Sequence, residues 1–219
     1  MKNVWYSLFA LIFLSCSGSV RHEQTSYAEI LTPETISFLL SEKPAQMDPG
    51  LYLYRNKQTH PLVVEFYNRV TTDREITAAI LSAADSYDVP LPLAFSLAWG
   101  ESSFRPQAVN HNSTSVDRGL FQLNSRTFPK LKEEHFFDPG INARHGLSHL
   151  RYCLDVGKSE LVALAMYNAG VSRVQRGTPY STLRHVARIL DNEKQLYDSF
   201  VKMLEDDAEI AEVLYTPLS

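Results

Sequence analysis

Apolar residues recur every three or four positions over most of the chain from residue 61 onward, which is the period of amphipathic helices. The stripe formed by Ile76, Ile80 and Ala84 is typical of this pattern. Thr72 is expected to cap the helix that begins at residue 73. On this period, and on start signals such as Asp138-Pro139, helices are predicted over residues 33–41, 61–70, 73–88, 90–101, 138–154, 159–169, 182–190 and 192–204. The chain is therefore predicted to be mainly α-helical.

Two stretches depart from the helical period. The sequence LYLYR at 51–55 alternates in a way that favours a short strand. The stretch 105–128 is rich in Asn, Ser, Thr and Gly, which predicts a polar loop with a small β-hairpin. We therefore expect a small β or loop excursion within a helical domain.

The N-terminal residues have the character of a targeting segment. Lys2 supplies a positive charge, and the apolar run Val4–Leu14 that follows is too short to span a bilayer comfortably. The sequence LSCSGS around Cys16 resembles a bacterial lipoprotein signal, in which Cys16 would become the acylated first residue of the mature chain. An ordinary cleaved signal peptide is the alternative.

Composition excludes several classes of protein. Apolar residues make up 44% of the 219-residue chain and charged residues 21%, which is ordinary for a globular protein. The net charge of −4, without a block of five basic residues, argues against nucleic-acid binding. Besides Cys16 the chain has only Cys153, predicted to be a buried thiol, so no disulfide framework is expected.

No metal or cofactor is expected. His145 and His149 are four residues apart, a spacing that can bind zinc on a helix. However, Gly146 occupies the position where a metalloprotease motif has Glu, and the sequence marks no third ligand.

Glu101 is the strongest candidate for chemistry. It ends a stretch in which residues 91–99 carry no charge. A carboxyl group held against apolar walls has a raised pKa and can serve as a general acid near neutral pH. A solvated carboxylate in the last turn of a helix is the alternative.

Three motifs follow one another in order: ESSFRPQA at 101–108, GLFQ at 119–122 and MYNAG at 166–170. They resemble the ESxFxPxA, GLMQ and AYNAG motifs of lytic transglycosylases of the lysozyme-like superfamily. The segment DPGINARHGLSHLRYCL is also similar to that family, with His149 where the family has Tyr. The resemblance covers about residues 73–190. It implies a mainly α, lysozyme-like helical domain with a small β/loop excursion, preceded by a short N-terminal extension.

The resemblance also implies an organisation and a reaction. Residues 1–16 would be the signal peptide, 17–72 a linker and N-terminal extension, 73–204 the transglycosylase domain and 205–219 a tail. The substrate would be the β-1,4 MurNAc–GlcNAc bond of peptidoglycan glycan strands. Glu101 would act first as general acid and then as base, closing a 1,6-anhydro ring. The enzyme would lie on the periplasmic side of the cell envelope, anchored to a membrane by lipid on Cys16.

Other site residues are carried over from the matched motifs. Ser113 lies where the family has a Ser that hydrogen-bonds the catalytic Glu, although a loop cap is an equal alternative. Gln122 and Asn124 would flank the glycan groove. Tyr167 and Asn168 would line its opposite wall, with helix packing as the other interpretation of Tyr167.

Two residues keep alternative functions open. His185, in TLRHV, replaces the Tyr of the family's T-x-x-Y-V segment and is a candidate substitute donor. Asp117 also resembles the second carboxylate of animal-type lysozymes, and with Glu101 it could form a retaining hydrolase pair. The MYNAG segment and the lack of lysozyme cysteines favour the lyase. A muramidase and a catalytically inactive wall-binding lipoprotein are the alternatives.

Overall fold

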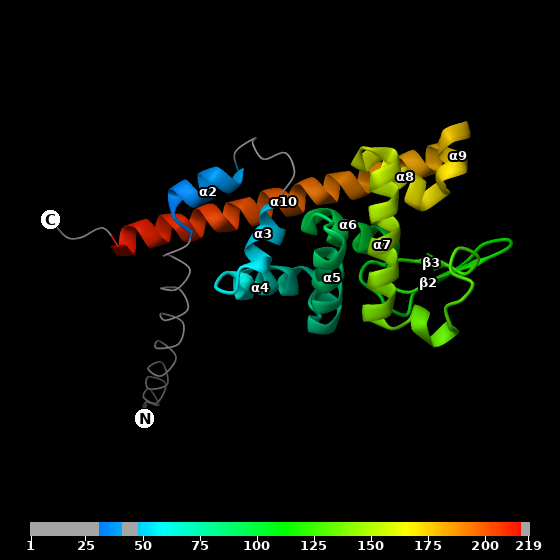
Figure 1. The fold of residues 1–219 in the computed structure, drawn as a ribbon, viewed down its shortest axis with the longest axis horizontal. Coiled ribbons are helices and arrows are strands. Elements are labelled where there is room, and N and C mark those ends of the chain that lie inside the picture. The colour runs from blue at the N-terminus through cyan, green and yellow to red at the C-terminus, as the bar shows by residue number, and fades with distance from the viewer. Residues whose placement is uncertain (1–30, 41–47, 216–219) are drawn as a thin grey trace, which may run out of the picture. The chain divides into compact units, whose positions relative to one another are not determined.

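The computed structural model of this chain describes residues 31–40 and 48–215 (Figure 1). The predicted signal segment at residues 1–16, with Cys16, lies outside these ranges. The described residues between Ser41 and Lys202 form one compact unit, and those up to Leu40 and from Met203 onward form a second. Within the described ranges, no helix combines the length and apolar character required to cross a bilayer.

The prediction of a mainly α fold with a small β excursion is confirmed. The larger unit contains, in order, α3 (Pro49–Arg55), α4 (His60–Thr71), α5 (Arg74–Tyr87), α6 (Leu91–Ser102), β1 (Val109–His111), β2 (Val116–Arg118), β3 (Leu123–Asn124), the 3-10 helix η1 (Glu133–Phe136), α7 (Pro139–Gly157), α8 (Glu160–Ala169), α9 (Val171–Arg176) and the first part of α10 (Tyr180–Tyr215). The second unit contains α2 (Pro33–Leu40) and the end of α10.

Helix α6 lies in the core of the larger unit. It is apolar on all sides, and Leu91, Leu93, Phe95 and Leu97 are buried, as expected for a helix surrounded by others. α5 packs against α7, and α7 packs against α8 (Figure 1). The core thus fixes the C-terminal end of α6, where Glu101 lies.

Four local predictions are corrected by the structure. Asp73, not Thr72, caps α5, because its carboxylate accepts the backbone N–H groups of Glu75 and Ile76. Thr72 has left-handed backbone angles and ends α4 instead.

The strand predicted for LYLYR is helix α3. Asp48 accepts the N–H of Leu51 and caps the helix, and Pro49 occupies its first turn. This start signal outweighs the alternation of the short segment.

The two helices predicted for 182–190 and 192–204 are one continuous helix, α10, which also begins two residues earlier, at Tyr180. The segment contains neither Gly nor Pro. In addition, Asn192 donates a hydrogen bond to the Ser96 hydroxyl of α6 at 2.9 Å. The residues at the expected break are therefore helical and contact α6.

The polar loop forms a three-stranded antiparallel sheet in the order β1-β2-β3, rather than a single hairpin. Asn142 of α7 ties this loop to the helices. Its side-chain oxygen accepts the N–H of Phe121 at 2.7 Å, and its amide donates to the carbonyls of Phe136 and Arg118. Gly119 is needed beside it, because a Cβ atom there would lie 1.9 Å from the Phe136 carbonyl oxygen. Its φ of +80° also favours glycine.

Candidate active site

A cleft of about 530 Å³ lies between the end of α6, the small sheet and the end of α8. It brings together six residues that the sequence selects. The lining residues are Glu101, Asn112, Asp117, Gln122, Leu123, Asn124, Thr127, Phe128, His149, Tyr167, Asn168, Ala169 and Gly170.

Glu101 lies in the last turn of α6 with its side chain 12% exposed. One carboxylate oxygen, Oε1, lies 3.0 Å from Nε2 of His185, whose side chain is 17% exposed. The two side chains shield each other from solvent, while Glu101 still reaches the cleft. A carboxyl group that is largely shielded from solvent and borders a cleft is placed to exchange a proton with a ligand bound there.

The packing of α10 on α6 brings His185 to Glu101. Gly100 faces Ile189, and a Cβ atom on Gly100 would lie 2.6 Å from Cγ1 of Ile189. The absence of a side chain at position 100 therefore permits the close approach of the two helices.

Ser102 is a structural residue of the site that sequence reasoning missed. Its buried hydroxyl donates to the Leu120 carbonyl at 2.7 Å and accepts the N–H of Arg105 at 3.2 Å. It ties the end of α6 to the GLFQ segment. Its position directly after Glu101 in the first motif was the available signal.

Asp117 is held by amide groups. Its Oδ1 accepts from Nδ2 of Asn124 at 2.6 Å, and its Oδ2 accepts from Nδ2 of Asn112 at 2.7 Å. Asp117 and Asn124 are paired across β2 and β3. Asp117 therefore organises the sheet side of the cleft through both of its carboxylate oxygens.

The two amides predicted to flank the glycan groove differ in what they can offer. Asn124 donates to Asp117 and Ser115 and accepts the N–H of Arg126. Gln122 donates to the carbonyls of Ala108 and Gly119. Within the described ranges the Gln122 oxygen has no partner, so it can accept a hydrogen bond from a ligand.

Tyr167 and Asn168 come from the end of α8. The Tyr167 hydroxyl donates to the Phe121 carbonyl at 2.8 Å. Burial, assisted by the nearby Glu101 carboxylate, raises the pKa of Tyr167 well above its ordinary value. The Thr182 hydroxyl donates to the side-chain oxygen of Asn168 at 2.9 Å, which leaves the Asn168 amide hydrogens for a ligand.

Ser113 is exposed in the turn between β1 and β2 and is not among the residues that line the cleft. Among the described residues, Glu101 has His185 and not Ser113 as its hydrogen-bond partner.

His149 lines the cleft, with its ring centroid 5.1 Å from that of Tyr167. Burial lowers the pKa of His149 and raises that of the neighbouring Cys153 thiol to about 11. Cys153 is buried, as predicted. In the part of the chain that the structure describes, no three His, Cys, Asp or Glu side chains are grouped as metal ligands.

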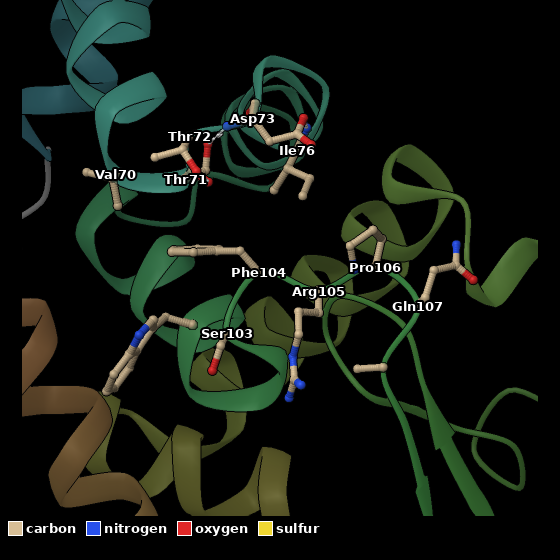
Figure 2. A pocket seen from close by; sticks show the side chains of 12 residues that line it. Val70, Thr71, Thr72, Asp73, Ile76, Ser103, Phe104, Arg105, Pro106 and Gln107 are labelled. Carbon is tan, nitrogen blue, oxygen red and sulfur yellow. Dashed lines mark hydrogen bonds between the residues drawn. The ribbon is translucent and has the colours of Figure 1, made fainter.

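A second hollow, of about 800 Å³, lies between the α4–α5 turn and residues 103–108. Figure 2 shows Thr72 and Asp73 on one side of it and Phe104 and Arg105 on the other. Glu101 does not line it. Although it is larger, it lacks the carboxyl group on which the candidate chemistry depends.

Comparison with known proteins agrees with this geometry. Residues 78–184 match the family described as the transglycosylase SLT domain. The chain is 31% identical over 99 residues to the invasion protein IagB of Salmonella typhimurium strain SL1344, and equally to that protein of strain LT2 and of Salmonella typhi. The alignment covers 42% of this chain and 62% of each relative, which is less than two thirds of their length. No solved structure shows a significant match.

The matched range contains the three motifs, and with them Glu101 and all the other residues that line the cleft. Residues 78–184 therefore belong to the transglycosylase SLT domain family.

Proposed function

We propose that this protein is a peptidoglycan lytic transglycosylase that cleaves the β-1,4 MurNAc–GlcNAc bond and leaves a 1,6-anhydro-MurNAc end. The observation that carries the proposal is the placement of Glu101. Its side chain is 12% exposed and borders the cleft, and one carboxylate oxygen is held by His185.

In the proposed reaction Glu101 works twice. The protonated carboxyl gives its proton to the glycosidic oxygen as the bond from that oxygen to C1 breaks and positive charge develops on the ring. The ionised carboxylate then removes the proton of the C6 hydroxyl on the same sugar. The C6 oxygen bonds to C1 and closes the anhydro ring, so no water is consumed and the Glu101 proton is restored.

The remaining cleft groups are suited to holding the glycan. The side-chain oxygen of Gln122 would accept from a sugar hydroxyl or N-acetyl N–H, and the Asn168 amide would donate to an N-acetyl carbonyl. Gly119 and Asn142 would keep the Gln122 segment in place.

A muramidase is the second candidate, because Asp117 lines the same cleft as Glu101. As nucleophile or general base, Asp117 would need a carboxylate oxygen directed at the sugar or at water. Both of its oxygens already accept hydrogen bonds, from Asn124 and Asn112. Oδ1 keeps a second lone pair, so these bonds leave Asp117 able to accept from water or a sugar, and it is the MYNAG segment that favours the lyase.

Glu101→Gln tests the proposal. We expect wall solubilisation by purified protein to fall by about 10²- to 10⁴-fold, the usual contribution of a positioned acid–base group. Glu134→Gln, at an exposed position in η1, is the matched control and should keep full activity. Undiminished activity of Glu101→Gln would contradict the mechanism, and an inactive wild-type protein would favour the wall-binding alternative.

Mass spectrometry of the released fragments separates the two enzymes. Anhydro ends are expected for the lyase. Products heavier by one water molecule would instead identify a muramidase, and Asp117→Asn should then abolish activity.

We also propose that the protein is anchored at the periplasmic side of the cell envelope by lipid on Cys16. The support is the sequence LSCSGS at the end of an apolar run. Cys16→Ala should move the protein out of the membrane fraction, whereas Ser17→Ala should leave it there. A mature N-terminus without an acyl group on Cys16 would contradict this.

A further inference from the structure

Both ring nitrogens of His185 have a charged or chargeable neighbour. Nε2 lies 3.0 Å from Oε1 of Glu101, and Nδ1 lies 3.3 Å from Nη2 of Arg188, one turn further along α10. The imidazole thus links an exposed guanidinium group to the carboxyl group of the candidate acid.

These contacts fix the direction of both hydrogen bonds. A guanidinium group has only donors, so Nδ1 of His185 must accept from Arg188. A neutral imidazole with an accepting Nδ1 carries its hydrogen on Nε2. Nε2 therefore donates to Oε1 of Glu101.

The neighbouring helix holds Arg188 in place. Its guanidinium carbon lies 5.7 Å from the ring centroid of Trp99, a cation–π contact. Trp99, Gly100 and Glu101 of α6 thus meet Arg188, Ile189 and His185 of α10, respectively. This register makes the Arg188–His185 contact a part of the helix interface.

We propose that Arg188 is a positioning residue that holds His185 as the Nε2–H tautomer. Oε1 of Glu101 is then occupied by a fixed N–H donor, and Oε2 is left to carry the catalytic proton. This inference rests on the proposed function for its role in catalysis, but the tautomer itself does not depend on turnover.

The opposite tautomer would interfere with the reaction. An imidazole with its hydrogen on Nδ1 presents a lone pair at Nε2, and a protonated Glu101 would donate to it. The proton required by the glycosidic oxygen would then be held in an internal hydrogen bond. In addition, the Nε2–H donor stabilises the carboxylate that forms once Glu101 has given up its proton.

Arg188→Met tests the proposal, because it keeps an unbranched apolar stem and removes the donor. Arg184→Met is the matched control: Arg184 is one turn earlier on α10, its guanidinium group lies over the ring of Tyr180, and within the described ranges it forms no hydrogen bond to the His185 ring. Arg188→Lys restores a donor with a different shape.

The direct readout is ¹⁵N NMR of protein labelled at histidine, with the His185 signals assigned from their loss in His185→Gln. We expect the Nε2–H tautomer alone in the wild type and in Arg184→Met, a mixture in Arg188→Met, and a shift back toward Nε2–H in Arg188→Lys. On a soluble glycan fragment, kcat of Arg188→Met should fall by about 10- to 100-fold, as for other residues that orient a functional imidazole, with KM little changed.

A pure Nε2–H signal in Arg188→Met would overturn the proposal. So would an equal loss of kcat in Arg188→Met and in the control Arg184→Met. The NMR measurement tests the role of Arg188 separately from the proposed enzymatic function. If Glu101→Gln retains activity, the proposed function fails, while the tautomer pattern still decides the role of Arg188.

Discussion

The hydroxyl groups of the buried Tyr67 and the half-buried Tyr167 differ in their partners. That of Tyr167 donates to the Phe121 carbonyl and joins α8 to the GLFQ segment. That of Tyr67 is buried against the rings of Phe95 and Phe200 and has no hydrogen-bond partner within the described ranges. A buried polar group without a partner costs free energy that its apolar counterpart does not.

Removal of each hydroxyl should therefore have opposite effects. We expect Tyr67→Phe to raise the free energy of unfolding by about 1 kcal/mol and Tyr167→Phe to lower it by a similar amount. Urea denaturation of the two variants and the wild type checks this. Equal destabilisation by both substitutions would show that Tyr67 has a partner.

The sequence identifies cleft residues better than it identifies their hydrogen bonds. Glu101, Gln122 and Tyr167 were selected by motif, and all three line the cleft. The motif does not reveal that backbone carbonyls occupy the Gln122 amide hydrogens, or that the Ser102 hydroxyl joins the end of α6 to Leu120. These partners come from segments brought together only by the fold.

At the level of secondary-structure elements, the contact between α6 and α10 decides the geometry of the candidate acid. Gly100 allows Ile189 to approach the α6 backbone, and His185 lies one turn away on the same face of α10. The close approach of α6 and α10 thus depends on the glycine at position 100.

Gly100→Ala should separate the two helices. We expect a loss of about 1–3 kcal/mol in the free energy of unfolding, as for other overpacked contacts, together with reduced activity. Gly140→Ala, at an exposed position of α7 with no neighbour nearer than 3.4 Å, is the control and should not destabilise.

A second substitution distinguishes crowding from other causes. Ile189→Ala in the Gly100→Ala background creates space for the new methyl group, so the double variant should lose less stability than the sum of the two single variants. Strictly additive losses would contradict a direct contact between the two positions.

Helix starts could be predicted where Pro, Asp or Ser marks them, as at Pro90, Asp138 and Ser159. The identity of α3 and the continuity of α10 could not. A short alternating segment fits either structure, and the polar residues near Asn192 suggest a break until their tertiary contact is known.

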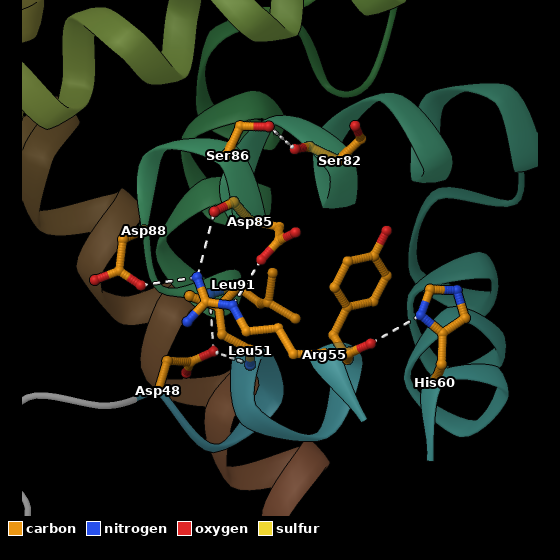
Figure 3. Close-up of polar contacts among 10 residues, drawn as sticks. Asp48, Leu51, Arg55, His60, Ser82, Asp85, Ser86, Asp88 and Leu91 are labelled. Carbon is orange, nitrogen blue, oxygen red and sulfur yellow. Dashed lines mark hydrogen bonds and ion pairs between the residues drawn. The ribbon is translucent and has the colours of Figure 1, made fainter. Parts of the chain in front are cut away.

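At the scale of the whole molecule, two half-buried carboxyl groups make stability depend on pH. Burial is the main cause at both Asp48 and Glu193, raising the pKa of the first from 3.8 to about 6 and that of the second from 4.5 to about 8. Figure 3 shows Asp48 accepting from the backbone of Leu51 and Leu91, while Arg55 pairs with other carboxylates nearby.

The sign of the effect follows from these raised values. Each carboxyl binds its proton more tightly in the folded chain, so its stabilising contribution is complete below about pH 4. That contribution is lost as the pH rises, up to about pH 6 for Asp48 and about pH 8 for Glu193.

Neutral substitutions should weaken this dependence. The free energy of unfolding of Asp48→Asn should fall less than that of the wild type between about pH 4 and pH 6, and that of Glu193→Gln less up to about pH 8. Urea denaturation across this range is the measurement, with Glu75→Gln, exposed on α5, as control. Curves parallel to the wild type would contradict the raised pKa values.

Hydrogen bonds within the protein use the amide hydrogens of Gln122 and the side-chain oxygen of Asn168. They therefore also define the chemistry of an effective inhibitor. Such a compound should present a hydroxyl or ammonium group to Gln122 and a carbonyl or sulfonyl oxygen to Asn168, because the opposite ends of both amides are already bonded to the protein. A compound with the reverse polarity would have to break contacts that hold the cleft together.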